Sequence, residues 1–183
     1  MSEQLLIRHC SPTLAGMKTG NMFTCTYRNL QEVQEYIRSL NRRLQHKGLR
    51  VLPLRYSGQR VLIYVYRPSR LSQDLQNRLA NTLLLERGYP CLTPERQILY
   101  LKKRLENTED FPHEIGLFLG YPPEDVYGFI ENKPDSCKYT GLWKVYGDAE
   151  EAKRTFDKFR KCTDVYSRCW EEGKSLERLT VRS

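Results

Sequence analysis

The chain has 183 residues, of which 39% are hydrophobic and 11% aromatic. That length fits one domain, or one domain with a closely packed helical subdomain, and that composition can fill a core, which excludes wholesale disorder. No apolar run is long enough to cross a membrane, and the opening residues MSEQLLIRHC lack the apolar stretch of a signal peptide. We therefore expect a cytoplasmic protein with no membrane insertion.

The net charge of +8 is concentrated in the middle of the chain. From Arg42 to Arg104 there are 14 Lys and Arg residues against 3 acids, a local balance of +11, whereas residues 105–183 carry −4. A basic middle with an acidic last third predicts one positively charged face. Such a face suits an anionic ligand or an acidic partner.

The six cysteines are scattered and include no CxxC pair, so the sequence predicts no zinc site of the ribbon or finger type. Cys162 and Cys169 are seven residues apart on an expected helix, roughly 10 Å along its axis, which is beyond disulfide reach. We expect reduced and mostly buried thiols.

The first half of the chain predicts the order β-α-β-β-α, typical of an α+β fold. A strand at 21–27 precedes an amphipathic helix that Asn29 opens and Gly48 ends, with an apolar face of Leu30, Val33, Ile37, Leu40 and Leu44. A hairpin follows at 49–67, in which Pro53 indicates an edge strand or a bulge. A helix at 70–87 then places Leu71, Leu75, Leu79 and Leu83 inward.

The second half predicts a helical insertion and a C-terminal strand with a long helix. Thr93 and Pro94 open one helix, two short helices flank residues 120–122, and a strand at 138–146 precedes a helix that Asp148 caps. Two segments share a strand–helix pattern: TGNMFTCTYRNLQEVQEYI and TGLWKVYGDAEEAKRTF. The shared pattern is either a duplication or two ordinary strand–helix units. It favours two layers on one sheet. The expected regions are 1–90, 91–136 and 137–183.

The stretch FPHEIGLFLGYPPEDVYGFI, residues 111–130, has the rhythm of a helix–turn–helix. Its second helix carries Glu124, Asp125 and Glu131, and residues 106–135 hold eight acids against one lysine. A DNA-reading helix needs basic or amide side chains, so DNA is disfavoured as a partner and a packed helical corner is favoured.

His113 and Glu114 are the candidate general acid and base in the same stretch. Adjacent helical residues point about 100° apart, and no HExxH motif is present. A helix start with Glu114 in the first turn is the simpler interpretation, and a catalytic role stays open.

The segment HCSPTLAGMKTGNMF, residues 9–23, is the preferred ligand site. Gly16 and Gly20 let backbone N–H groups approach an anion, and Lys18 would complete the cradle. The segment matches neither the P-loop nor the dinucleotide-binding motif, so a surface loop with a core cysteine is the alternative. A thiol-dependent enzyme is a second alternative, with Cys10 as nucleophile, His9 or His113 as base, and Lys18 or His9 lowering the thiol pKa.

The hairpin at 49–67 interleaves arginines with tyrosines, a composition that suits RNA or an acidic partner. Arg55, Arg60 and Arg67 are the candidate binding residues. Strand alternation, however, puts Arg67 on the face opposite Tyr64 and Tyr66, so one combined platform is not expected.

Three blocks of the sequence are similar to an uncharacterised bacterial family of anaerobic Firmicutes, domain of unknown function 3793. The blocks are LIRHCSPTLAGMKTGNMF, FPHEIGLFLGYPPEDVYGFI, and CKYTGLWKVYGDAEEA continued by FRKCTDVY and EGKSLERL. The resemblance implies no activity, cofactor or catalytic residue. It implies a gene context of flavodoxins and iron transport, and hence a flavodoxin as one acidic partner for the basic face.

The sequence therefore favours an accessory or binding protein that takes an anionic ligand or an acidic partner, linked to redox or iron metabolism. A thiol enzyme using Cys10 and an RNA-binding protein are the alternatives. The sequence names no cofactor.

Overall fold

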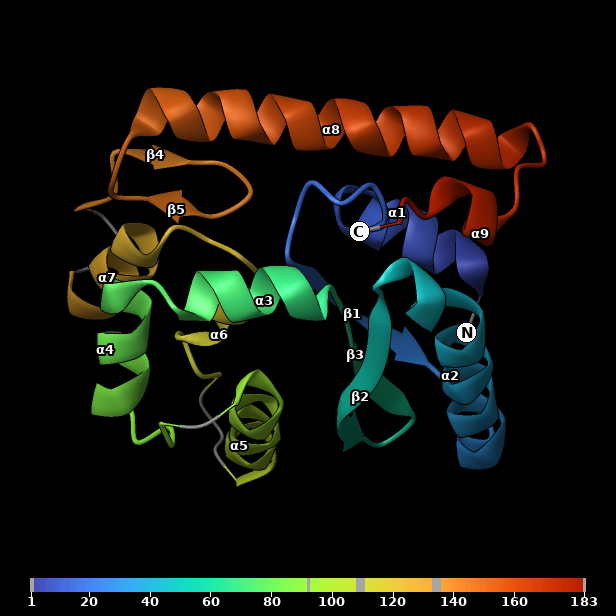
Figure 1. Cartoon of the computed structure of the whole chain (residues 1–183), viewed down its shortest axis with the longest axis horizontal. Coiled ribbons are helices and arrows are strands. Elements are labelled where there is room, and N and C mark those ends of the chain that lie inside the picture. Colours follow the sequence, from blue (N-terminus) through green and yellow to red (C-terminus); the bar gives the residue numbers. More distant parts are fainter. Residues whose placement is uncertain (1, 92, 108–110, 133–135, 183) are drawn as a thin grey trace. The chain divides into compact units, whose positions relative to one another are not determined.

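Helices make up 59% of the chain and strands 15%, so the protein is α+β, as the sequence predicts. The computed structural model describes residues 2–91, 93–107, 111–132 and 136–182. The chain divides into two compact units. The first unit is Met1–Arg70 with Lys161–Ser183, and the second unit is Leu71–Arg160 (Figure 1).

The first unit is built on an antiparallel sheet with the strand order β1-β3-β2. The predicted run of a strand, a helix and a hairpin is confirmed, and a helix that was not predicted, α1, precedes it. The strand β2 is an edge strand whose register shifts between Pro53 and Arg55, as the proline indicated. The elements of this unit are α1 (Glu3–Leu14), β1 (Gly20–Thr26), α2 (Leu30–Leu44), a 3₁₀ turn (Gln45–Lys47), β2 (Arg50–Ser57), β3 (Arg60–Tyr66) and α9 (Leu176–Leu179).

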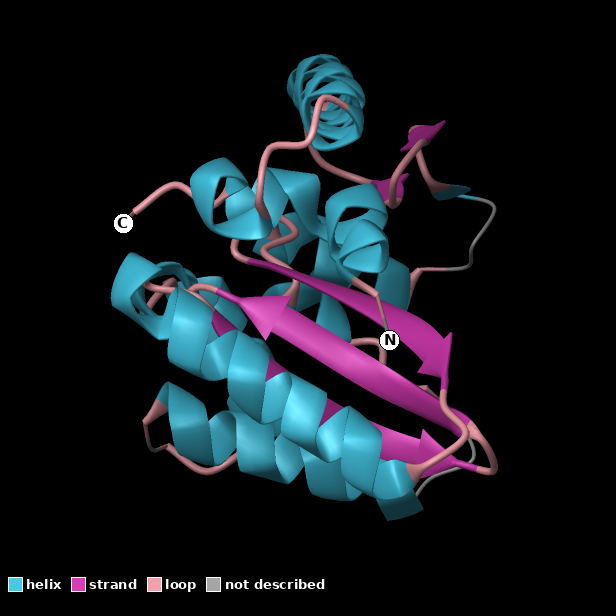
Figure 2. Ribbon diagram, turned by 90° about the vertical axis from the view of Figure 1, so that its right-hand side faces the viewer, coloured by secondary structure: helices cyan, strands magenta, loops and turns pink. Residues whose placement is uncertain are grey.

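The core of the first unit lies between one face of the sheet and helices α1 and α2 (Figure 2). Val61, Ile63 and Val65 alternate along β3 and point into this core, as period-two spacing requires. The side chain of Asn29 accepts a hydrogen bond from the N–H of Gln31 and caps α2. Leu30 is 45% exposed, so its assignment to the buried face was wrong: it stands at the first position of α2.

The second unit is mainly helical. Its elements are α4 (Arg78–Glu86), α5 (Pro94–Asn107), α6 (Ile115–Phe118), α7 (Pro123–Glu131), β4 (Tyr139–Thr140) and β5 (Lys144–Val145), while α3 (Pro68–Leu75) and α8 (Ala149–Glu171) have residues in both units. The predicted helix at 70–87 is in fact two helices. Asn77 ends the first run and caps α4 by accepting from the N–H groups of Leu79 and Ala80, and the new phase leaves Leu79 exposed.

The predicted strand at 138–146 is a small hairpin. The N–H of Lys138 donates to the carbonyl of Val145 at 2.8 Å, and the chain reverses between β4 and β5. This hairpin is a sheet of its own, separate from β1-β3-β2, so the expectation of two layers on one sheet is wrong. Asp148 caps α8 through the N–H groups of Glu150 and Glu151, as its spacing to Glu151 indicated.

The limits of the units differ from the expected boundaries at 90 and 136. Residues after 160 return to the first unit, where the Lys47 ammonium donates to the carbonyls of Glu177 and Thr180. The leucines of α4 belong to the second unit instead. In the described part of the chain, no helix combines the length and apolar character needed to cross a membrane.

Candidate ligand pocket

The preferred anion site at residues 9–23 is not an open loop, because residues up to Leu14 belong to α1. Gly16 ends this helix with φ +74°, a conformation that favours glycine. Lys18 is buried, its ammonium donates to the carbonyl of Gly20, and burial lowers its pKa to about 7. Lys18, Gly16 and Gly20 therefore lie in or against the core, and their arrangement gives no geometric support to an anion cradle.

Arg67 is a structural residue rather than an exposed ligand-binding one. Its side chain is 0% exposed, and its guanidinium donates to the carbonyls of Thr13 (2.7 Å), Leu14 (2.7 Å), Lys47 (3.2 Å) and Val181 (2.8 Å). The first two carbonyls end α1 and the third ends the 3₁₀ turn, where the helix dipole favours a cation. Four bonds occupy four of the five N–H donors, so the geometry gives little support to the ligand role expected for Arg67.

The remaining hairpin arginines do not share a face with exposed aromatic rings. Arg60 is exposed at the turn and Arg55 is half-buried, while Tyr64 and Tyr66 stack on each other at 4.6 Å and are both buried. The sheet therefore offers no Arg and Tyr platform of the kind that stacks RNA bases, as strand alternation indicated.

Cys10 and His9 are adjacent in α1 but point in different directions. Cys10 is 0% exposed, and burial raises the pKa of its thiol even though the charge of Lys18 acts the other way. His9 is exposed and stacks on Phe23 at 5.3 Å, and partial burial lowers its pKa. A buried thiol with a raised pKa is a poor nucleophile, so this geometry does not support Cys10 as the catalytic thiol.

His113 and Glu114 also diverge, as their adjacency predicted. Glu114 is buried and accepts a hydrogen bond from the Tyr89 hydroxyl at 2.9 Å, and its Oε1 lies 3.0 Å from Nε of Arg104. These contacts give Glu114 a structural role inside the second unit. His113 is exposed, meets the ring of Phe129 edge-on at 4.8 Å, and lines a pocket.

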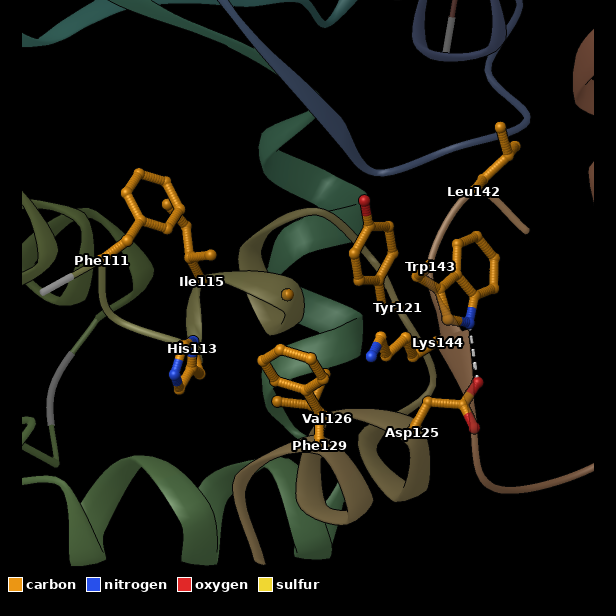
Figure 3. A pocket seen from close by; sticks show the side chains of 11 residues that line it. Phe111, His113, Ile115, Tyr121, Asp125, Val126, Phe129, Leu142, Trp143 and Lys144 are labelled. Carbon is orange, nitrogen blue, oxygen red and sulfur yellow. Dashed lines mark hydrogen bonds between the residues drawn. The ribbon is translucent and has the colours of Figure 1, made fainter. Parts of the chain in front are cut away.

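That pocket lies between α6, α7 and the β4–β5 hairpin, and has a volume of about 280 Å³ (Figure 3). Its lining is mostly aromatic and aliphatic, and eight of the eleven lining residues come from 111–130. The lining residues are Phe111, His113, Ile115, Gly116, Tyr121, Asp125, Val126, Phe129, Leu142, Trp143 and Lys144. An apolar cavity with a few polar groups is the usual character of a small-molecule site.

Trp143 forms a wall of this pocket and is held from three directions. Its ring stacks on Tyr121 at 4.6 Å and meets Phe156 edge-on at 4.4 Å. Its Nε1–H donates to Asp125 at 2.8 Å, the bond drawn in Figure 3. A ring fixed in this way gives a pre-formed surface for a flat ligand.

Asp125 joins α7 to the segment that follows β5. Besides the indole of Trp143, its carboxylate accepts from the N–H groups of Tyr146 and Gly147, each at 2.8 Å. This acid, which the sequence offered as a source of repulsion for DNA, is buried and used internally. Gly116 lets α6 approach α7, since a Cβ there would lie 2.8 Å from Cγ2 of Val126.

Two nitrogen-bearing side chains of the pocket come from opposite ends of its sequence. The side chain of Lys144 extends from β5 toward the ring of Phe129, and the imidazole of His113 stands beside the same ring (Figure 3). Phe111 and Leu142 are 47% and 46% exposed, and line the pocket where it meets solvent. The arrangement can hold a flat apolar body with an anionic substituent.

Sequence reasoning interpreted residues 111–130 as core packing and did not find this pocket. One signal was present: Phe111, Tyr121 and Phe129 fall within a short segment that predicts only brief helices and a turn, and Trp143 follows in the predicted strand at 138–146. So many large rings exceed what short elements can bury. The excess ring surface forms the wall of the pocket.

Two comparisons with known proteins gave no match and one gave a family. A family model described as "Protein of unknown function (DUF3793)" matches residues 6–180, nearly the whole chain. No curated protein and no solved structure matches the chain.

Proposed function

Since the chain belongs to the DUF3793 family of proteins of unknown function, its function has to be argued from its own geometry, and we propose that it binds a small, flat, anionic ligand. The proposed site is the pocket between α6, α7 and the β4–β5 hairpin. The single observation that carries the proposal is the fixed ring of Trp143 facing an aromatic cavity that also holds Lys144.

The size and the lining support a ligand of one or two rings. A volume of about 280 Å³ is just below the range for small-molecule sites, which is about 300–1,000 Å³. Tyr121, Phe129 and Trp143 offer ring faces, and Ile115 and Val126 offer aliphatic surface. Apolar surface buried against these groups supplies affinity without any covalent step.

The anionic substituent follows from the charge of Lys144. Asp125 accepts three hydrogen bonds from its own surroundings, so its carboxylate is compensated internally. Lys144 brings a permanent positive charge to the lining, which favours a ligand with a carboxylate or similar group. The anionic ligand that the sequence favoured is thus assigned to a different site from the segment around Lys18.

The test is titration of fluorescence from Trp143 in a Trp170→Phe background, with naphthoate and its neutral amide as probes. We expect saturable quenching by both probes and about fivefold to tenfold tighter binding of the carboxylate. Lys144→Met should remove that preference, whereas Lys158→Met, an exposed lysine of α8, should retain it. No saturable response to either probe would overturn the proposal.

Other functional expectations stay predictions. They are a cytoplasmic location, an acidic partner such as a flavodoxin with a link to redox or iron metabolism, and RNA as the alternative partner. The exposed Arg60 and the half-buried Arg55 stay the candidate contacts for such partners.

A further inference from the structure

The aromatic pocket carries polar side chains at two separate places in its lining. Lys144 comes from β5, and His113 comes from the turn that leads into α6. In Figure 3 the ammonium of Lys144 and the imidazole of His113 lie on opposite sides of the Phe129 ring. A flat ligand that lies along this ring and places its anionic group at Lys144 therefore brings its other end toward His113.

The position of His113 is set by its own backbone and by one ring contact. Its carbonyl accepts from the N–H of Gly116 at 3.3 Å, and the carbonyl of Pro112 accepts from the N–H of Ile115 at 3.1 Å. Its imidazole meets the ring of Phe129 edge-on at 4.8 Å. These contacts fix the imidazole at the wall of the pocket without a hydrogen bond to either ring nitrogen.

The ring nitrogens of His113 are accessible to a ligand. The side chain is exposed, and within residues 2–91, 93–107, 111–132 and 136–182 its imidazole forms no hydrogen bond or ion pair with another residue. The neighbouring Glu114 shows the contrast, because its carboxylate accepts from the Tyr89 hydroxyl at 2.9 Å. A polar group of this kind at the wall of an apolar pocket is what fixes the orientation of a ligand.

Other polar groups of the lining are less suited to that second end. The carboxylate of Asp125 and the indole N–H of Trp143 bond each other at 2.8 Å. The hydroxyl of Tyr121 points away from the Phe129 ring in Figure 3. His113 is therefore the polar residue best placed to meet the end of the ligand that lies opposite the anionic group.

The imidazole favours a hydroxyl over a second acid. A neutral imidazole carries one N–H donor and one acceptor nitrogen, and the tautomer decides which nitrogen is which. A hydroxyl both donates and accepts, so it can bond either tautomer, whereas a carboxylate only accepts. Phe111, which lines the pocket two residues before His113, is apolar and adds no charge that would favour a second ionised group.

We propose that the pocket takes a hydroxylated aromatic carboxylic acid, with its carboxylate at Lys144 and its hydroxyl at His113. This inference rests on the proposed function, and adds to it the second polar group of the ligand and the residue that recognises it. Binding requires no covalent step. His113, which the sequence offered as a general base, acts here as a specificity residue.

The experiment uses two probes of nearly equal shape, 6-hydroxy-2-naphthoate and 6-methyl-2-naphthoate. Both carry the carboxylate and the variable group at opposite ends of two fused rings. Isothermal titration calorimetry on the full-length protein gives the Kd of each probe, and the ratio of the two Kd values cancels the contributions of the rings and of the carboxylate. The ratio of the methyl Kd to the hydroxyl Kd should be about fivefold higher in the wild-type protein than in His113→Phe, as one hydrogen bond gives.

Two further variants separate recognition from packing. His113→Gln restores a donor and an acceptor, and should recover part of the preference for the hydroxyl. His46→Phe, at an exposed position of the first unit, should leave the ratio unchanged. Binding of both probes with the same ratio in the wild-type protein and in His113→Phe would overturn this inference and leave the proposed function in place. Binding of neither probe by the wild-type protein would overturn both.

Discussion

The two units treat their polar side chains in opposite ways. In the first unit, Arg67 and Lys18 are buried and their donors are used by backbone carbonyls of the same unit. In the second unit, the ring of Trp143 and the side chain of Lys144 line a cavity. Polar chemistry stabilises the first unit, and in the second unit some of it is directed at a ligand.

This difference shows why charge alone is a poor indicator of a site. Two of the candidates in the sequence were the cations Lys18 and Arg67, and the fold uses both to bond backbone carbonyls of the first unit. The aromatic pocket is instead lined mostly by aromatic and aliphatic residues, which carry no charge. Each prediction below tests one side of this comparison.

Arg67→Met should have the largest effect. It removes the guanidinium that donates to the buried carbonyls of Thr13 and Leu14 and to the carbonyl of Val181, so we expect a loss of more than about 3 kcal/mol in the free energy of unfolding. Chemical denaturation measures it, with Arg60→Met, at an exposed position, as the control expected to change stability by less than about 0.5 kcal/mol. Equal losses of unfolding free energy in the two variants would show that Arg67 does not stabilise the first unit.

Asp125→Asn should lower the stability of the second unit by about 2 kcal/mol. The carboxamide can accept from the N–H groups of Tyr146 and Gly147, but its NH₂ then meets the indole N–H of Trp143, which is also a donor. Denaturation monitored through Trp143 fluorescence gives the change, and the emission should shift as the ring is released. Glu124→Gln, at an exposed neighbouring position, is the control. An unchanged Trp143 emission spectrum in Asp125→Asn would contradict the role of the three hydrogen bonds that Asp125 accepts.

Lys18 should make the first unit more stable as pH rises. Its folded pKa is about 7 against an ordinary 10.5, so between these values the unfolded chain binds more protons than the folded one. From about pH 7 to 8.5 the free energy of unfolding should rise by about 1–2 kcal/mol, and Lys18→Met should abolish this rise.

The upper limit of that range is set by Cys10. Burial raises the pKa of its thiol above the ordinary 9.0, so above that pH it favours the unfolded chain. Wild-type protein and Lys18→Met are therefore compared below about pH 8.5. Parallel pH profiles of the two proteins would show that Lys18 is not neutralised by burial.

Tyr36→Phe should have the smallest effect and marks an exception within the first unit. The hydroxyl of Tyr36 is buried and has no hydrogen-bond partner among the described residues. Removing it should be neutral or stabilising by up to about 1 kcal/mol, since no bond is lost. A destabilisation as large as that of an average core substitution, measured by thermal unfolding, would mean that the hydroxyl is bonded after all.

Local patterns predicted the fold better than the site. Asn29, Pro94 and Asp148 marked helix starts, and Pro53 marked an edge strand, because capping and ring geometry act within a few residues. The helix at 3–14 was missed because its Ser-Pro and glycine neighbours resemble a turn, although Pro12 is tolerated near its end.

The sites depended on contacts that no short pattern contains. Arg67 finds acceptors 20, 53, 54 and 114 positions away, so its burial follows from the assembled unit and not from the hairpin. The aromatic pocket likewise brings Phe111 and His113 to a hairpin about thirty residues later. Residues of this kind are recognised once the long-range packing is known.

The division into units also bears on how the chain is made. The second unit is one continuous run, Leu71–Arg160, whereas the first unit needs residues 161–183 in addition to 1–70. A ribosome releases residues in order, so the second unit is complete while Arg67 still lacks the carbonyl of Val181 and Lys47 lacks that of Thr180. During synthesis the first unit exists as a partly bonded precursor, and residues 161–183 complete it when they emerge after the second unit.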